Sequence, residues 1–348
     1  MNVQARAIDI PLVDIRNLSM SFASRRGLLS HVTRGGAPKV QAVDDVSLQI
    51  RRGEIFSLVG ESGSGKTTFG RAVLRLVEPT SGQVLLRGEN ILDFSRSRLL
   101  QVRREVQMIF QNPYASLNPR MTVRQMLSEA LSVHQICPRA EVNGRVAALL
   151  ELVGLNASHA DRLPRDFSGG QRQRIGIARA LSVEPVFIVA DEPVSAVDVS
   201  VQAQIMNLLL DLRERLDLTL LFIAHDLSVV RYVSTRVGVM YLGRIVEVGP
   251  RREIFTEPCH PYTQGLLRAA PRLDPNHRST AIAIGGEPPS PMSPPAGCHF
   301  HPRCPMATEI CRTTPPPLAP VRAEHLVACH HHDRAAERWT APGQPIHA

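Results

Sequence analysis

The strongest chemical signal in the chain is an eight-residue segment with the spacing G-x-x-x-x-G-K-T. Glycine-rich loops of this kind wrap backbone N–H groups around a phosphate, while the lysine reaches the terminal phosphates and the last hydroxyl holds Mg²⁺. An apolar run at 55–59 precedes the segment and a helix-forming run at 67–74 follows it, as the motif requires. The predicted ATP-binding loop comprises Gly60, Glu61, Ser62, Gly63, Ser64, Gly65, Lys66, Thr67 and Thr68.

Two acids, Asp191 and Glu192, directly follow an apolar run at 187–190. Open α/β sheets bind ligands at the carboxyl ends of their strands. We therefore predict that Asp191 holds Mg²⁺ and that Glu192 orients and deprotonates the attacking water. Gln111 and His225 also follow apolar runs, so each is predicted at a strand end from which it could reach a terminal phosphate.

A second anion cradle is predicted where a helix begins. The segment is Ser168, Gly169, Gly170 and Gln171, and a helical run to about residue 181 follows it. Free N–H groups and the helix dipole converge at such an end. The same residues also form ordinary helix caps, so the segment alone is a weak signal.

The elements that must position these residues alternate along the chain. Strands are predicted at 12–22, 41–50, 83–86, 186–190 and 218–223, with a hairpin at 237–248 and mainly helix at 121–184 and 201–216. This alternation indicates an α/β fold with a largely parallel sheet. From about residue 255 proline becomes frequent, and such a segment packs little core of its own unless something staples it.

Composition limits the possible functions. The chain has 348 residues, of which 43% are hydrophobic, and no apolar run reaches the ~18 residues that a membrane helix needs. Its formal charge is +8, but the arginines are dispersed and only four Tyr and one Trp could stack on bases. We therefore expect a cytosolic protein that does not bind nucleic acid, with a basic surface that could lie near anionic lipid.

The order of these segments resembles the ATP-binding cassette (ABC) ATPases over roughly residues 12–270. The resemblance implies that Phe22 stacks on adenine, that Gln111 touches Mg²⁺ and the membrane partner, and that His225 is the switch histidine. It also implies that 60–67 is the Walker A loop, that Asp191 and Glu192 are Walker B and the catalytic base, and that Asp198 lies in the D-loop. Residues 168–171 are then the family signature, which serves the ATP of an opposing subunit in a head-to-tail dimer. Phe167 and Val197 replace the usual leucines of the signature and the D-loop, and neither change removes a polar group.

This resemblance implies an ABC-type nucleotide-binding domain at 10–255. Such a domain has a RecA-like parallel-sheet core, an antiparallel β subdomain and a helical signature subdomain, expected at about 112–182. A Cys- and Pro-rich C-terminal extension is expected at 256–335 and a flexible tail at 336–348.

A narrower resemblance links the chain to the ATP-binding subunits of oligopeptide and dipeptide importers. It is carried by 110–120, 191–204 and 260–267, and the insertion after Phe22 also fits it. It implies a second, similar ATPase subunit in a heterodimer, two permeases and an extracytoplasmic solute-binding protein, with the chain peripheral on the cytoplasmic face of the inner membrane. Nickel and glutathione importers share these segments, so the cargo stays open, as does a homodimer.

Four cysteines near the C-terminus, Cys298, Cys304, Cys311 and Cys329, resemble the extension of that branch. In a cytosolic protein such a group of cysteines indicates a metal site rather than a set of disulfides. The tight C-x2–4-C pairs of zinc sites are missing, and some members of the branch carry a [4Fe–4S] cluster there. We expect an iron–sulfur cluster. Zinc stays possible because His299, His301 and His330 lie close by in sequence, and free thiols remain a further alternative.

Two other classes of ABC protein compete with an importer ATPase. Soluble DNA-repair or translation ABC proteins carry coiled-coil, zinc-hook or tandem-cassette insertions, and this chain has one cassette and none of these. A catalytically dead, regulatory cassette disagrees with the intact Lys66, Glu192 and His225. The sequence therefore favours an ATP-hydrolysing importer subunit.

Overall fold

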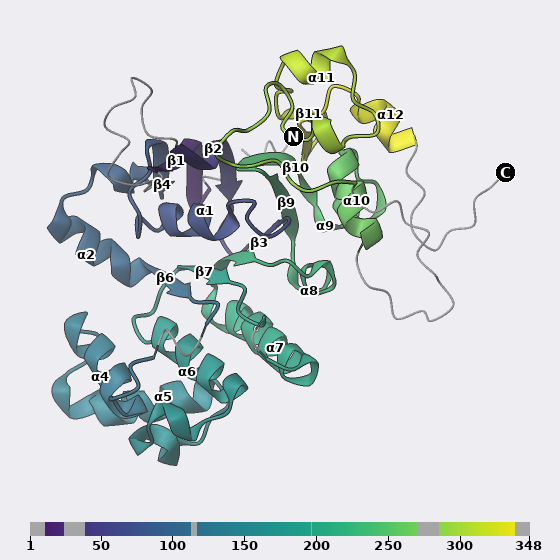
Figure 1. Ribbon diagram of the computed structural model, residues 1–348. Coiled ribbons are helices and arrows are strands. Elements are labelled where there is room, and N and C mark those ends of the chain that lie inside the picture. The colour runs from purple at the N-terminus through teal and green to yellow at the C-terminus, as the bar shows by residue number, and fades with distance from the viewer. Residues whose placement is uncertain (1–10, 24–38, 113–116, 196, 270–284, 338–348) are drawn as a thin grey trace, which may run out of the picture. The chain divides into compact units, whose positions relative to one another are not determined.

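A computed structural model describes residues 11–23, 39–112, 117–195, 197–269 and 285–337 (Figure 1). The chain forms two compact units that interleave in sequence. The first unit contains residues 1–12, 50–55 and 86–223, and the second contains 13–49, 56–85 and 224–348. The domain boundaries that the sequence indicates at 112–182 and 255 remain predictions. From residue 338 onward the predicted flexible tail lies outside the described residues.

Three parallel strands form the centre of the first unit, in the order β8-β7-β6. They are β6 (Val106–Ile109), β7 (Phe187–Asp191) and β8 (Thr219–Ile223). Every residue of β7 and β8 is buried. This burial explains why both strands are continuous apolar runs without alternation, as in parallel sheets covered on both faces.

Helices make up most of the rest of the first unit. A group of three, α4 (Val123–Val133), α5 (Val142–Leu152) and α6 (Gly169–Leu181), packs together (Figure 1). Leu127, Leu131, Val146 and Leu150 are fully buried, so the helices predicted within 121–184 each bury an apolar face. The remaining elements are β5 (Glu89–Asn90), η2 (Ile91–Asp93), α2 (Arg96–Glu105), η3 (Arg139–Glu141), η4 (Ala157–Asp161), η5 (Pro164–Asp166) and α7 (Val199–Leu216).

The second unit contains strands of two sheets. In one, β1 (Val13–Ala23) lies between β2 (Lys39–Ile50) and β4 (Ser81–Leu86). In the other, β3 (Ile55–Val59) pairs in parallel with β9 (Arg236–Tyr241). Strand β9 then pairs antiparallel with β10 (Arg244–Pro250) across the predicted turn at Leu242 and Gly243. Helices α1 (Lys66–Val73), α8 (Leu227–Val233), α9 (Arg251–Thr256) and α10 (Pro261–Ala269) complete this part.

The proline-rich C-terminal segment has more structure than the sequence indicates. It adds two strands, β11 (Ala319–Arg322) and β12 (His325–Val327), and β12 pairs antiparallel with β10. It also contains η6 (His301–Arg303), α11 (Glu309–Thr313) and α12 (His332–Glu337). Phe300 and Val327 are buried. The segment therefore contributes to the core of its own unit, which its proline content conceals.

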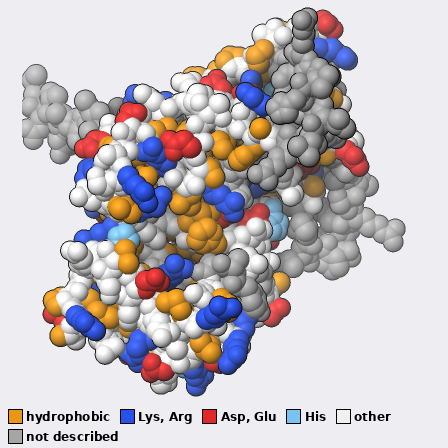
Figure 2. Space-filling view, turned by 60° about the vertical axis from the view of Figure 1, so that its left-hand side comes forward, with side chains coloured by type: hydrophobic (Ala, Val, Ile, Leu, Met, Phe, Trp, Pro, Cys, Tyr) orange, Lys and Arg blue, Asp and Glu red, His pale blue; other side chains and the backbone are white. Residues whose placement is uncertain are grey.

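None of the helices in the described ranges is both long enough and apolar enough to cross a membrane. Basic side chains occur in several separate groups, mixed with acidic and apolar ones, on the face that Figure 2 shows. On that face no single basic stripe appears, in keeping with the dispersed arginines of the sequence.

Candidate nucleotide site

The predicted phosphate loop joins β3 to α1 within the second unit. Gly60 and Gly65 have positive φ angles of 154° and 104°. A Cβ on Gly60 would lie 2.1 Å from the carbonyl oxygen of Met240, and one on Gly65 would lie 2.0 Å from that of Ala42. Only glycine therefore fits at these two positions, because a backbone carbonyl cannot move away as the end of a side chain can.

The loop lysine is already held where the motif needs it. Lys66 is 5% exposed, and its Nζ donates hydrogen bonds of 2.8 Å to the carbonyl oxygens of Gly60 and Glu61. A contact of 3.2 Å to Ser64 Oγ completes the set. Helix α1 begins at Lys66, and its N-cap residue Gly65 has no side-chain cap, as suits a helix N-terminus that binds an anion. Ser62 and Gly63 are exposed, and Thr67 and Thr68 are half-buried.

Glu61 is held differently from its neighbours in the loop. Its carboxylate accepts hydrogen bonds of 2.7 and 3.0 Å from Arg303, and its backbone N–H donates to the hydroxyl of Tyr262 at 2.8 Å. Both partners lie in the C-terminal part of the second unit. No sequence pattern points to these contacts.

In the first unit, the strand register brings Gln111 and Glu192 together. Ile109 of β6 lies opposite Ala190 of β7, and the two side chains follow shortly after the ends of these paired strands. Gln111 Nε2 donates to Glu192 Oε2 at 2.7 Å. Glu192 has a left-handed backbone with φ of 44°, an uncommon conformation for a residue with a side chain and one that occurs at functional sites. Asp191 before it is buried.

The segment at 168–171 forms the N-terminus of α6, as predicted. The Ser168 hydroxyl accepts from the backbone N–H of Gln171 at 3.3 Å, and the Gln171 side chain accepts from that of Ser168 at 3.0 Å. This reciprocal capping box uses two of the orphan amides and leaves the N–H groups of the glycines for other partners. Phe167, which stands where the signature usually has leucine, is buried, so the core accommodates the larger side chain.

The remaining predicted residues are at chain positions accessible to a ligand. Phe22, near the end of β1, is 41% exposed. His225 is exposed and follows Ala224, whose N–H donates to Leu58 O of β3 at 3.2 Å. Because Leu58 lies two residues before Gly60, this bond brings His225 to the end of β3 where the phosphate loop begins. Asp198 is exposed at the N-cap of α7.

Known proteins resemble this chain in sequence. The family described as ABC transporter matches residues 43–195, and the family described as oligopeptide/dipeptide transporter, C-terminal region, matches 246–311. A peptide import ATP-binding protein of Brucella ovis is 52% identical over 92% of this chain and 98% of its own length. The oligopeptide transport ATP-binding protein AppF of Bacillus subtilis is 48% identical over 92% of this chain and 97% of its own.

The chain belongs to the ATP-binding proteins of ABC transporters. Among solved structures, it is similar to the dimeric bacterial ABC transporter cassette MJ0796, with a TM-score of 0.59 and 27% identity over 69% of this chain and 99% of that one. It is also similar to cbiO1 from Clostridium perfringens, part of the cbiONQ complex, with a TM-score of 0.60 and 27% identity over 71% of this chain and 91% of that one. The predicted ABC fold and ATPase activity are thereby confirmed. ATP, with Mg²⁺, is the ligand of this cassette.

The four predicted cysteines lie in the C-terminal segment, at residues 298, 304, 311 and 329. Cys311 is buried and Cys298, Cys304 and Cys329 are half-buried. The backbone N–H of Cys298 donates to Cys311 O at 2.8 Å. Burial raises the pKa of Cys304 to about 11 and that of Cys329 to about 12, and the thiols of the other cysteines add to both shifts. Within the described ranges, no three of these four thiols lie within 4.8 Å of one another, so the expected iron–sulfur cluster remains a prediction.

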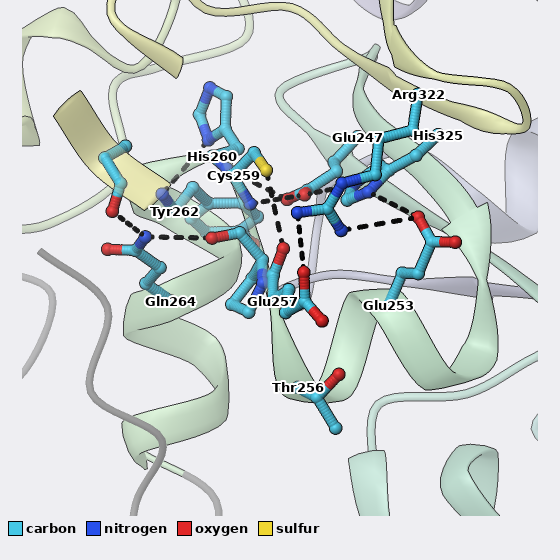
Figure 3. Close-up of polar contacts among 12 residues, drawn as sticks. Glu247, Glu253, Thr256, Glu257, Cys259, His260, Tyr262, Gln264, Arg322 and His325 are labelled. Carbon is cyan, nitrogen blue, oxygen red and sulfur yellow. Dashed lines mark hydrogen bonds and ion pairs between the residues drawn. The ribbon is translucent and has the colours of Figure 1, made fainter. Parts of the chain in front are cut away.

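A separate buried network, which sequence reasoning missed, also lies in the second unit (Figure 3). Within the described ranges, Glu247, Cys259 and His325 are the one group of three potential metal ligands whose donor atoms all lie within 4.8 Å of one another. Glu247 already accepts hydrogen bonds of 2.6 Å from the N–H of Cys259, 3.1 Å from that of His260 and 2.7 Å from His325 Nε2. Because protein donors use the carboxylate fully, we interpret this group as a structural network that joins β10, β12 and the start of α10.

Proposed function

We propose that this chain is the ATP-hydrolysing subunit that powers an importer of di- and oligopeptides. The observation that carries the proposal is the pair of relatives named for peptide import or oligopeptide transport, which are 48 and 52% identical over 92% of the chain. The match of residues 246–311 to the oligopeptide/dipeptide C-terminal region supports the same cargo class.

The second unit would hold the nucleotide. Backbone amides of residues 60–68 would surround the β- and γ-phosphates, Lys66 would neutralise their charge and the Thr67 hydroxyl would bind Mg²⁺. Phe22, with its exposed ring, would stack on adenine. His225 would contact the γ-phosphate. The hydrogen bond from the N–H of Ala224 to Leu58 O supports this, because it holds the neighbouring His225 near the end of β3.

The first unit would carry the hydrolytic groups. Asp191 would hold Mg²⁺, with Gln111 as a further contact, and Glu192 would accept the proton of a water whose oxygen attacks the γ-phosphorus. The bond from the γ-phosphorus to the bridging oxygen breaks, and ADP leaves. The hydrogen bond between Gln111 and Glu192 supports this assignment because it fixes the carboxylate that must face the water.

The signature would serve a second subunit. Ser168, Gly169, Gly170 and Gln171 would cap the γ-phosphate of an ATP that the opposing cassette holds, with Asp198 at the D-loop of that interface. Closure around two ATP molecules and reopening after hydrolysis would supply the motion for transport. A heterodimer with a similar cassette, two permeases and a solute-binding protein would complete the importer at the cytoplasmic face of the membrane.

The four cysteines would hold a [4Fe–4S] cluster that staples the C-terminal extension. Burial raises the pKa of Cys298, Cys304 and Cys329, and the charge of neighbouring cysteines adds to each shift, which supports one site for all four. Zinc is the second candidate at this site. A structural role explains why a proline-rich segment keeps a fixed fold, and electron transfer is not required.

Uptake in cells tests the proposal. A strain that lacks this chain should lose uptake of labelled di- and oligopeptides, and wild type should restore it. Lys66→Ala, produced at the same level, should not. Peptide uptake that is unchanged in the deletion strain, together with loss of nickel or glutathione uptake, would replace the cargo assignment and keep the ATPase assignment.

A further inference from the structure

An arginine of the C-terminal segment is clamped to the phosphate loop. Arg303 Nη1 and Nη2 donate to the two carboxylate oxygens of Glu61 at 2.7 and 3.0 Å, across 242 positions of sequence. The Arg303 side chain is only 5% exposed, so solvent screens this ion pair little. Glu61 is 28% exposed, so the pair is partly buried, and its bidentate guanidinium–carboxylate contact is strict in its geometry.

The other polar groups of Glu61 are also engaged. Its N–H donates to the Tyr262 hydroxyl at 2.8 Å, and its carbonyl oxygen accepts from Lys66 Nζ at 2.8 Å. Glu61 therefore links two residues of the C-terminal region, Arg303 and Tyr262, to the lysine that receives the phosphates. Glu61 is also the residue that directly precedes the exposed turn at Ser62 and Gly63.

The C-terminal residues that make these contacts are themselves fixed. The rings of Tyr241, Tyr262 and Phe300 pack with centroids 4.6 to 5.4 Å apart, and Arg303 lies 5.8 Å over the ring of Tyr241. The N–H of Tyr262 donates to His260 Nδ1 at 3.0 Å, and His260 in turn is tied to Glu247 in the network of Figure 3. Arg303 and Tyr262, which hold Glu61, are therefore fixed by a packed aromatic cluster and by a buried polar network.

We infer that the C-terminal region is a positioning element for the phosphate loop, in which Arg303 and Tyr262 hold Glu61 and, through its carbonyl, Lys66. The inference rests on the proposed nucleotide site. It gives the extension a function apart from any metal. Since Arg303 directly precedes Cys304, a change that unfolds the cysteine segment would also release the loop.

Nucleotide affinity of the full chain tests this role. Arg303→Ala should weaken binding of a fluorescent ATP analogue and raise KM for ATP by about tenfold. This effect is smaller than the loss seen when one partner of a fully buried ion pair is removed, because Arg303 acts on ATP only through Glu61. The value of kcat should stay within about twofold, because the chemical groups are untouched. Arg303→Lys should recover part of the affinity. Arg252→Ala, at an exposed arginine of the same region, is the matched control and should bind ATP as wild type does.

A double-mutant cycle separates positioning from a general loss of structure. If Arg303 acts through Glu61, Glu61→Ala and the Arg303→Ala/Glu61→Ala double variant should bind ATP equally weakly. Additive losses would overturn the inference. If Arg303→Ala does not fold, Tyr262→Phe is the alternative variant, because it removes one hydroxyl and keeps the ring. It should raise the Kd for ATP several-fold. Wild-type affinity for ATP in that variant would overturn the inference. Lys66→Ala should lose ATP binding. If it does not, the proposed nucleotide site is wrong; if it does and the Arg303 and Tyr262 variants bind as wild type, only the inference about the C-terminal region is wrong.

Discussion

Gln111 Nε2 lies 2.7 Å from Glu192 Oε2 and donates a hydrogen bond to it, just beyond the ends of the paired parallel strands β6 and β7. The bond orients a carboxylate at the end of β7. A general base must lie within reach of the proton that it takes, so a donor that orients the base also contributes to the rate. Two distinct effects are therefore expected from substitutions at these positions.

Glu192→Gln should remove the base and keep the shape of the site. We expect ATP turnover to fall by at least ~10²-fold, with ATP still bound, because amide and carboxylate are nearly isosteric. Phosphate release and binding of a fluorescent ATP analogue measure the two quantities, and dimers that accumulate with ATP should be visible by light scattering. Unchanged turnover would remove Glu192 as the base.

Gln111→Ala should act more gently, because it removes the orientation and leaves the base. Losing one hydrogen bond to a charged group costs about 1.5–3 kcal/mol, which corresponds to roughly a ten- to hundredfold lower kcat. The variants Gln111→Ala and Glu192→Gln should be far from additive when combined, since both act on one group. Independent effects in the double variant would show that Gln111 does not work through Glu192.

The glycines of the phosphate loop offer a matched pair. Gly65→Ala places a Cβ 2.0 Å from Ala42 O and should abolish ATP binding. Gly63→Ala meets nothing within 4 Å, and its φ of 78° costs only about 1 kcal/mol, so it should bind ATP with less than tenfold loss. Isothermal titration of both variants with ATP checks this. Equal losses in the two variants would mean that backbone strain, and not close approach, makes glycine necessary at position 65.

These pairs also show how far sequence reasoning reaches. The positions of Gln111 and Glu192 at strand ends follow from apolar runs, and the loop follows from its spacing, because both signals are local in sequence. The ion pair of Arg303 with Glu61 spans 242 residues, and no period or motif encodes it. Likewise, His325 lies in a short strand within a proline-rich segment, and its partner Glu247 is identified only when β12 pairs with β10.

A buried histidine makes stability depend on pH. Burial lowers the pKa of His260 to about 4, which outweighs the opposite effect of the neighbouring Glu247. The unfolded chain binds a proton at this side chain below about pH 6.5, whereas the folded chain stays neutral until about pH 4. Stability should therefore fall as pH drops from 6.5 to 4, by up to about 3 kcal/mol from this group.

Urea unfolding followed between pH 7 and pH 5 measures that slope. His260→Gln removes the titrating ring, so its stability should change less with pH than that of wild type, even if it is lower at pH 7. Identical slopes in wild type and His260→Gln would contradict the assigned source of the pH dependence.

The cysteine site should fail as a unit when one member is lost. In anaerobically purified wild type we expect iron and sulfide together with absorbance near ~400 nm, as for a [4Fe–4S] cluster. Cys304→Ser should lose the colour and most of the iron, and the C-terminal segment should become more sensitive to protease because its staple is gone. Cys137→Ser, outside the cluster, should keep both. Colourless wild-type protein with stoichiometric zinc would replace the cluster by a zinc site, and protein with neither metal would leave four free thiols, in which case Cys304→Ser should be as protease-resistant as Cys137→Ser.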